Sequence, residues 1–195
     1  MTMTPRLRKF VLTTHVTASV GWLGAVAVFL ALGVIGVSSQ DAPTVRGVYL
    51  VMEPAGWSVL VPLALASLLT GLVQSLGTTW GLFRHYWVLF KLVINVLATL
   101  VLLLYMQTLG YLADAAAKVS SSGADLEGLR NSSPALHAGA ALHAGAALLL
   151  LLIAAALSVY KPRGMTRYGQ RREQQRRAER SGAMARATAP AAQPR

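Results

Sequence analysis

Four long apolar stretches, separated by polar segments, dominate the hydrophobic pattern of this chain. A helix rises about 1.5 Å per residue, so each stretch is long enough to cross a hydrocarbon core about 30 Å thick. None shows the polar face that a soluble helix needs. The pattern therefore predicts an all-α, polytopic membrane protein with a bundle of four transmembrane helices. These helices are predicted at residues 10–37, 54–76, 87–112 and 135–160.

The remaining segments complete the predicted organisation. Residues 1–9 form a short N-terminal segment, residues 10–160 the four-helix domain and residues 161–195 a basic tail. The tail has almost no large apolar side chain, so we expect it to be disordered in solution. The first apolar stretch, about 28 residues, exceeds the length typical of a signal peptide, so we expect it to remain as a helix.

Turn-forming residues predict how the helices are connected. We expect residues 38–56 to form a loop, with Pro54 in the first turn of the second helix. Pro62 lies deeper and should kink that helix, because proline removes a backbone hydrogen bond. A tight turn at 77–86 makes the second and third helices antiparallel neighbours, and residues 113–133 form a second polar loop.

Basic residues are distributed unequally over the two sides of the predicted bundle. The loops 38–56 and 113–133 hold only Arg46, Lys118 and Arg130, and the other 15 of the 18 Lys and Arg residues lie at the opposite side. Short segments rich in Lys and Arg stay in the cytoplasm. Arginine outnumbers lysine 14 to 4, which is typical of a GC-rich bacterial genome. We therefore predict a multi-pass protein of the bacterial inner membrane with both termini in the cytoplasm.

Composition also narrows the function and the partners. The absence of cysteine excludes disulfides, thiolate metal sites and cysteine nucleophiles. The middle of the bundle lacks ionisable groups, which disfavours a pump or channel. We expect the lipid bilayer to be the main partner, with anionic headgroups against the tail, where each basic residue contributes about 1 kcal/mol. The tail has no aromatic residues interleaved with its charges, so we expect no nucleic acid. A homo-oligomer or a membrane-protein partner remains open.

Polar residues at similar depths predict a pocket near the cytoplasmic side. His15, Gln74, Lys91 and Asn95 all lie within about two turns of that side, in three different helices. Lys91 and Asn95 stand four apart and share a helix face. His15 either hydrogen-bonds a neighbouring helix or serves as a ligand or proton-handling group. Lys91 either lines the pocket or extends its ammonium to the headgroups.

The fourth helix carries a short repeat with two histidines at the other side of the bundle. His137 and His143 are six residues apart and point about 120° away from each other, so they do not form a one-face metal pair. His15 lies about 10 Å from His143 in depth, which disfavours a shared copper site. The repeat also predicts that Gly139 and Gly145 approach a neighbouring helix closely.

Two short motifs resemble known families. His15, Trp22 and Gly24 follow the His-x6-Trp-x-Gly pattern in the first helix of copper resistance D-like proteins and of membrane-bound haem-containing protoporphyrinogen oxidases. The string from Trp87 to Lys91 and the following leucine is similar to the start of their third helix. In overall look the chain resembles actinobacterial four-helix proteins of unknown activity. In the oxidases the histidine is held to bind haem and the lysine is required, so the resemblance implies these roles for His15 and Lys91.

We therefore expect an accessory or binding module that is not an enzyme and acts through the inner pocket. A haem-binding membrane oxidoreductase is the first alternative. The cofactor stays unknown, and whether haem or a metal is bound stays open. A copper-handling membrane protein is the second alternative.

Overall fold

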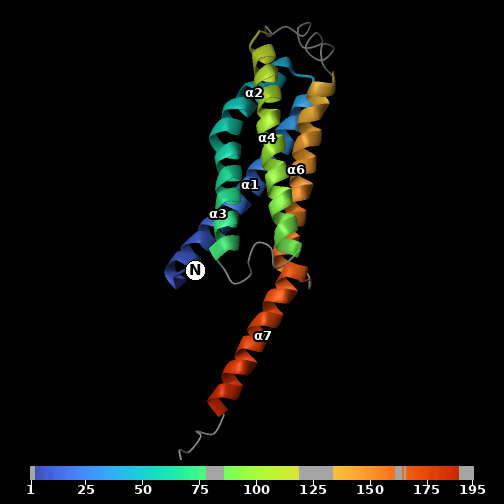
Figure 1. Cartoon of the computed structure of the whole chain (residues 1–195). Helices are drawn as coiled ribbons and strands as arrows, with labels where there is room; N and C mark the ends of the chain where they lie inside the picture. The colour runs from blue at the N-terminus through green and yellow to red at the C-terminus, as the bar shows by residue number, and fades with distance from the viewer. Residues whose placement is uncertain (1–2, 78–85, 119–133, 161–163, 165, 189–195) are drawn as a thin grey trace, which may run out of the picture.

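The computed structural model describes residues 3–77, 86–118, 134–160, 164 and 166–188, with the backbone alone at 134–138 and 185–188. Every regular element in this part of the chain is a helix (Figure 1). The elements are α1 (Pro5–Ser38), α2 (Ala42–Ala55), the π-helical turn η1 (Gly56–Leu60), α3 (Val61–Gly77), α4 (Tyr86–Lys118), α6 (Pro134–Tyr160) and α7 (Arg167–Thr188).

Four stretches are long and apolar enough to cross a membrane, as predicted, and they are Pro5–Ser38, Ala42–Gly77, Tyr86–Lys118 and Gly139–Tyr160. They run alternately up and down, and α1 crosses the others diagonally (Figure 1). We call the end that holds the start of α1, the end of α3 and the start of α4 the lower end. The upper end is the one where α1 ends and α2 begins.

The second span starts earlier than the sequence analysis predicts. Only Ser39 to Asp41 separate it from α1, so most of the expected loop 38–56 is helix. Asp41 caps the helix, because its carboxylate accepts a hydrogen bond of 3.0 Å from the backbone N–H of Thr44, and Pro43 lies in the first turn. Pro54 therefore lies inside a helix and not at its start.

The polar residues that made this segment look like a loop are accommodated by α4. Arg46 donates from Nε to the carbonyl of Ala116 over 3.1 Å, and Glu53 lies half-buried beside Gly110. The turn η1 lies between Pro54 and Pro62, and the span changes direction there (Figure 1). Two prolines and a π turn are the usual causes of such a bend.

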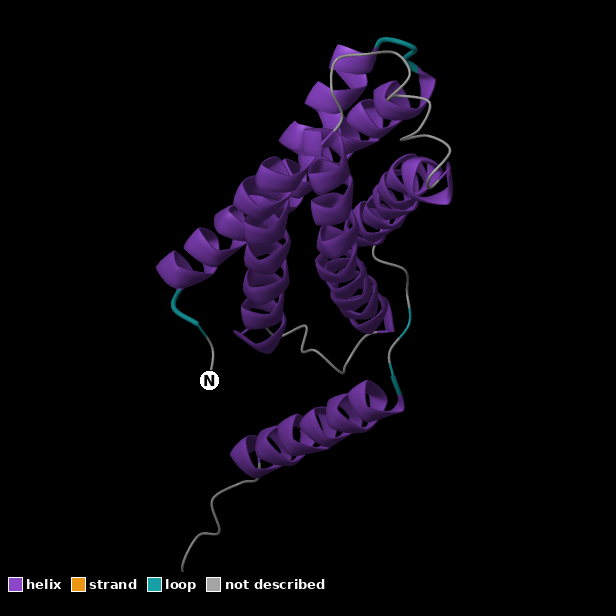
Figure 2. Ribbon diagram, turned by 90° about the horizontal axis from the view of Figure 1, so that it is seen from above, coloured by secondary structure: helices purple, strands orange, loops and turns teal. Residues whose placement is uncertain are grey.

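The ends of the other helices also differ from the predicted limits. α4 continues to Lys118, so the first six residues of the expected loop 113–133 are helical. The rest of that loop and the turn predicted at 77–86, apart from its first and last residues, lie outside the described residues. The tail, which we expect to be disordered in solution with residues 166–180 able to become helical on the membrane, contains the helix α7, and α7 stands apart from the bundle (Figure 2). Its charged residues lie on all sides, and Arg177 pairs with Glu173 at 3.5 Å, the i, i+4 spacing that supports an exposed helix.

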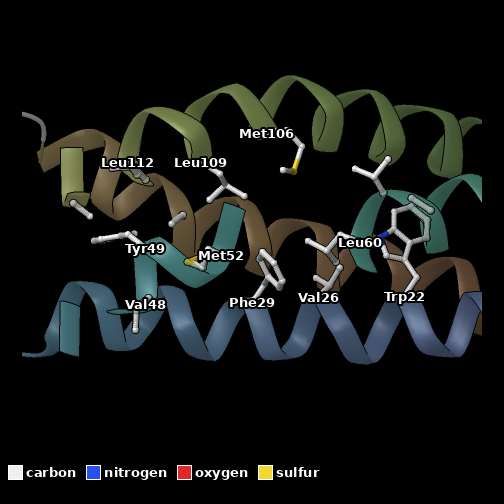
Figure 3. Packing of buried hydrophobic residues seen from close by; sticks show 14 of the residues in the cluster. Trp22, Val26, Phe29, Val48, Tyr49, Met52, Leu60, Met106, Leu109 and Leu112 are labelled. Carbon is white, nitrogen blue, oxygen red and sulfur yellow. The ribbon is translucent and has the colours of Figure 1, made fainter. Parts of the chain in front are cut away.

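An apolar core fills the bundle from its middle to its upper end (Figure 3). Its largest fully buried apolar side chains come from α1, α2 and α4, and they are Trp22, Val45, Tyr49, Met52, Met106, Leu109 and Leu112. These residues recur at spacings of three and four, which places them on one face of each helix.

Small residues let α6 pack against α1, but not through the glycines that the repeat indicated. A Cβ on Gly33 would lie 3.0 Å from the backbone nitrogen of Ala141 and 3.1 Å from its Cα, so the two backbones are in direct contact. A Cβ on Gly145 would meet only Leu30, at an ordinary 3.8 Å, and one on Gly139 would meet only His143 of the same helix. The close approach is therefore made by Gly33, and the prediction for Gly139 and Gly145 was wrong.

Candidate functional site

Two polar stripes face each other where α1 meets α3 in the lower half of the bundle. On α1 the stripe consists of His15 and Ser19, four residues apart. On α3 it consists of Ser67, Thr70, Gly71 and Gln74, which follow the i, i+3, i+4, i+7 spacing of one helix face. Ser19 and Ser67 join the stripes through a hydrogen bond of 2.8 Å between their hydroxyl oxygens.

His15 is the best-buried ionisable side chain in this contact, with 9% of its surface exposed. Its Nδ1 lies 3.1 Å from the carbonyl oxygen of Ser67 and 3.1 Å from the hydroxyl oxygen of Thr70. The Thr70 hydroxyl donates in turn to the carbonyl of Ala66 over 2.5 Å. His15 therefore bonds to the neighbouring helix, one of the two roles that its position predicted.

These partners determine which ring nitrogen of His15 carries the proton. A carbonyl oxygen only accepts, so Nδ1 must be the donor to Ser67, and the neutral ring keeps a lone pair on Nε2. Ligand histidines use this arrangement, in which a carbonyl orients the ring and leaves the other nitrogen free for the ligand. Gly71 provides the space, because a Cβ there would lie 3.0 Å from Cε1 of the imidazole.

The other three predicted pocket residues lie in the lower half as well, and none of them is hydrogen-bonded to His15. Gln74 is one turn below Thr70 on the same face of α3, and its side chain is half-buried. Lys91 is half-buried on α4, near enough that its charge acts on the imidazole of His15. Asn95 is one turn above Lys91 and only 8% exposed. No hydrogen bond joins these three side chains to any residue in the described part of the chain.

The charge of Lys91 thus acts on the imidazole of His15. Gln74 lies one turn from Thr70 on α3, and Asn95 lies one turn from Lys91 on α4. The direct partners of His15, however, are Ser67, Thr70 and Gly71, which the sequence analysis missed. Their spacing on one helix face was the available signal. It was overlooked because Ser and Thr are common in membrane helices, where they usually bond to their own backbone.

The histidine of the upper half has a different environment. His143 is exposed on α6, donates from Nδ1 to the carbonyl of Gly139 over 2.8 Å, and stacks on Tyr105 with 4.6 Å between the ring centroids. Since Ala141 contacts Gly33, His143 lies roughly 24 Å from His15 measured along the axis of α1, so the two histidines are far apart. The side chain of His137 lies outside the described residues.

Metal binding finds no support in these positions. No group of three or more His, Asp or Glu side chains within the described residues is arranged to hold a metal ion. The separation of His15 and His143 also rules out a single copper ion that both would ligate.

The two remaining residues of the first-helix motif are structurally distinct. Trp22 is 1% exposed in the apolar core, and its Nε1 has no hydrogen-bond partner among the described residues. Gly24 lies on the exposed face of α1, with nothing within 4 Å of the position of a Cβ. Compared with known proteins, the chain matches no family model, no curated protein and no solved structure. The resemblance of the two motifs to the copper resistance and oxidase families therefore stays a prediction.

Proposed function

We propose that this chain is a multi-pass protein of a bacterial inner membrane that works as an accessory or binding module through His15. The observation that carries the proposal is the bond from Nδ1 of His15 to the Ser67 carbonyl, which leaves Nε2 with a free lone pair. An imidazole placed in an apolar bundle is costly unless it bonds to protein or ligand, and among the described residues only Nδ1 of His15 bonds to protein.

The proposed orientation places both termini and the whole lower end in the cytoplasm. Arg6, Arg8 and Lys9 precede the first long apolar run, Lys91 lies near the start of α4, and the arginines of α7 follow α6, all at the lower end. Short basic segments are retained on the cytoplasmic side. Alkaline phosphatase fused after Arg195 should be inactive, whereas a fusion in the loop after Lys118 should be active. The reverse pattern would overturn the orientation.

A haem-binding oxidoreductase is the second proposal, and one observation favours it. The carbonyl that orients the imidazole of His15 is the kind of partner that haem-ligating histidines use. His15 would hold the iron of the haem and Lys91 would pair with a carboxylate of the haem, which would supply electron-transfer chemistry when bound. The contact of His15 with Gly71 opposes this reading, because a haem would reach Nε2 only after α1 and α3 separate. We therefore prefer the accessory or binding module to the haem-binding oxidoreductase.

Native mass spectrometry of protein purified from its own membrane tests the ligand role of His15. Wild-type protein should retain a bound mass that His15→Ala loses and His143→Ala keeps, since His143 lies far away on α6. A wild-type protein without bound mass, or equal retention by both variants, would refute it. An absorption spectrum of the same sample separates the two proposals, because haem gives a Soret band.

A further inference from the structure

The helix α7 carries more arginines than any other described element, and it stands apart from the bundle (Figure 2). Seven of its residues are arginines and two are glutamates. Thr166 begins the helix, because its hydroxyl oxygen accepts a hydrogen bond of 3.1 Å from the backbone N–H of Gly169. Both sides of this highly charged helix are therefore accessible to a partner.

The charges of α7 surround the helix, but its net charge lies mainly on one side. Since each residue turns a helix by about 100°, Tyr168, Arg171 and Arg172 lie within an arc of about 100°. All three side chains are exposed, and Nε of Arg172 donates to the Tyr168 hydroxyl over 3.2 Å. Glu179 lies on this side too, but about 10 Å further along the helix. We call Tyr168, Arg171 and Arg172 the arginine face.

The opposite side of α7 is partly neutralised within the helix. Glu173, Arg177 and Arg180 lie within about 60° of one another and roughly 160° away from the arginine face. Arg177 forms an ion pair with Glu173, with 3.5 Å between Nε and Oε1. One of the two arginine charges on this side is therefore balanced by a carboxylate. Among the described residues, neither Arg171 nor Arg172 forms an ion pair.

The connection to the bundle keeps the start of α7 close to the membrane. Residues 161–166 separate Tyr160, the end of α6, from the start of α7, so these two points are at most about 25 Å apart. In this connection a Cβ on Gly164 would lie 3.9 Å from Cδ2 of Tyr86, the first residue of α4. α7 thus begins beside the lower end, where α4 and α6 reach the membrane surface.

From these observations we propose that α7 docks on the surface of an anionic bilayer, with its arginine face against the phosphate groups of the lipids. A guanidinium binds phosphate through two parallel N–H bonds, and tyrosine is enriched at membrane interfaces. α7 has no continuous apolar face, so charge holds it at the surface and it does not insert. The inference goes beyond the His15 module and takes only the leaflet, the cytoplasmic one, from the proposed orientation.

Electron paramagnetic resonance of a single spin label tests the docking. The chain has no cysteine, so Gln175→Cys allows one label on the side of the arginine face. The full chain is placed in nanodiscs of phosphatidylcholine, with or without one fifth phosphatidylglycerol. The label should be immobilised when phosphatidylglycerol is present. It should be mobile without this lipid and in 1 M salt, where the Debye length falls to about 3 Å. A label that is equally mobile in all three samples would overturn the proposal.

A matched pair of double variants tests which face of α7 docks. Arg171→Gln with Arg172→Gln should lower the ratio of docked to free α7 about 10- to 30-fold, since two basic residues leave the surface. Arg177→Gln with Arg180→Gln removes the same charge from the far side of a helix about 10 Å wide, more than the Debye length of about 8 Å. This second variant should change the ratio by less than about threefold. Equal effects of the two double variants would overturn the assignment of the arginine face.

Three further outcomes separate the explanations. Arg171→Lys with Arg172→Lys keeps the charge and should keep most of the docking, whereas its loss would show that charge does not hold α7. A label that is mobile on phosphatidylglycerol but immobilised by added RNA would identify a nucleic acid as the partner and overturn the proposal. Both leaflets of a nanodisc have the same composition, so docking together with active phosphatase after Arg195 would refute the orientation alone.

Discussion

In the upper half of the bundle α1 meets α6 through small and apolar side chains, whereas in the lower half α1 meets α3 through hydroxyls and an imidazole. Tyr49 and Met52 are fully buried in the upper half, and the backbone of Gly33 contacts that of Ala141. In the lower half His15 and Ser19 bond to α3, while Lys91 and Asn95 have no hydrogen-bond partner on the described chain. The contact between α1 and α6 is therefore held together by packing, and the contact between α1 and α3 by hydrogen bonds as well.

The largest expected effect is on the packing of the upper half. Gly33→Leu should lower the stability in detergent by about 1–3 kcal/mol, because the nearest atoms belong to the backbone of Ala141, which cannot yield like a flexible side chain. Gly24→Leu is the matched control on the same helix, with open space around its Cβ position. Thermal unfolding of both variants measures the difference, and equal melting temperatures would mean that α1 and α6 are not in close contact.

An intermediate effect is expected at the hydroxyl pair that joins α1 to α3. Ser19→Ala, Ser67→Ala and the double variant form a cycle whose coupling energy should be about 0.6 kcal/mol, the average for hydrogen bonds between membrane helices. Stability in mixed micelles gives the coupling. A value near zero would show that the hydrogen bond contributes nothing net and that the two halves differ less than their contacts indicate.

The smallest effect is expected at Asn95. The Asn95 side chain has no hydrogen bond to another described residue, so Asn95→Leu should change the stability by less than about 0.5 kcal/mol in detergent. Ser67→Leu provides the contrast, because it removes the partner of Ser19 from a buried position. A large loss of stability for Asn95→Leu would show that the Asn95 amide has a structural role in the lower half.

A contact between segments far apart in the sequence explains why the sequence analysis found the four spans but misplaced the start of the second one. Arg46, Glu53 and Pro54 interrupt the apolar pattern, and each is normally a sign of a loop. Asp41 and Pro43 form a helix start that outweighs this sign only once Arg46 can donate to the carbonyl of Ala116 on α4. The partner lies 70 residues away in the chain, so the residues around Arg46 do not predict it.

The sequence by itself determined the all-helical class, the four apolar spans and the excess of basic residues at one side. Those properties follow from composition and helical spacing, which require no knowledge of neighbours. Only the tertiary structure decided that His15 donates to Ser67, that Gly71 makes room for the imidazole, and that Gly33, not Gly139 or Gly145, is the point of close approach. These features depend on the rotation and register of one helix against another, and side-chain packing across the bundle determines both.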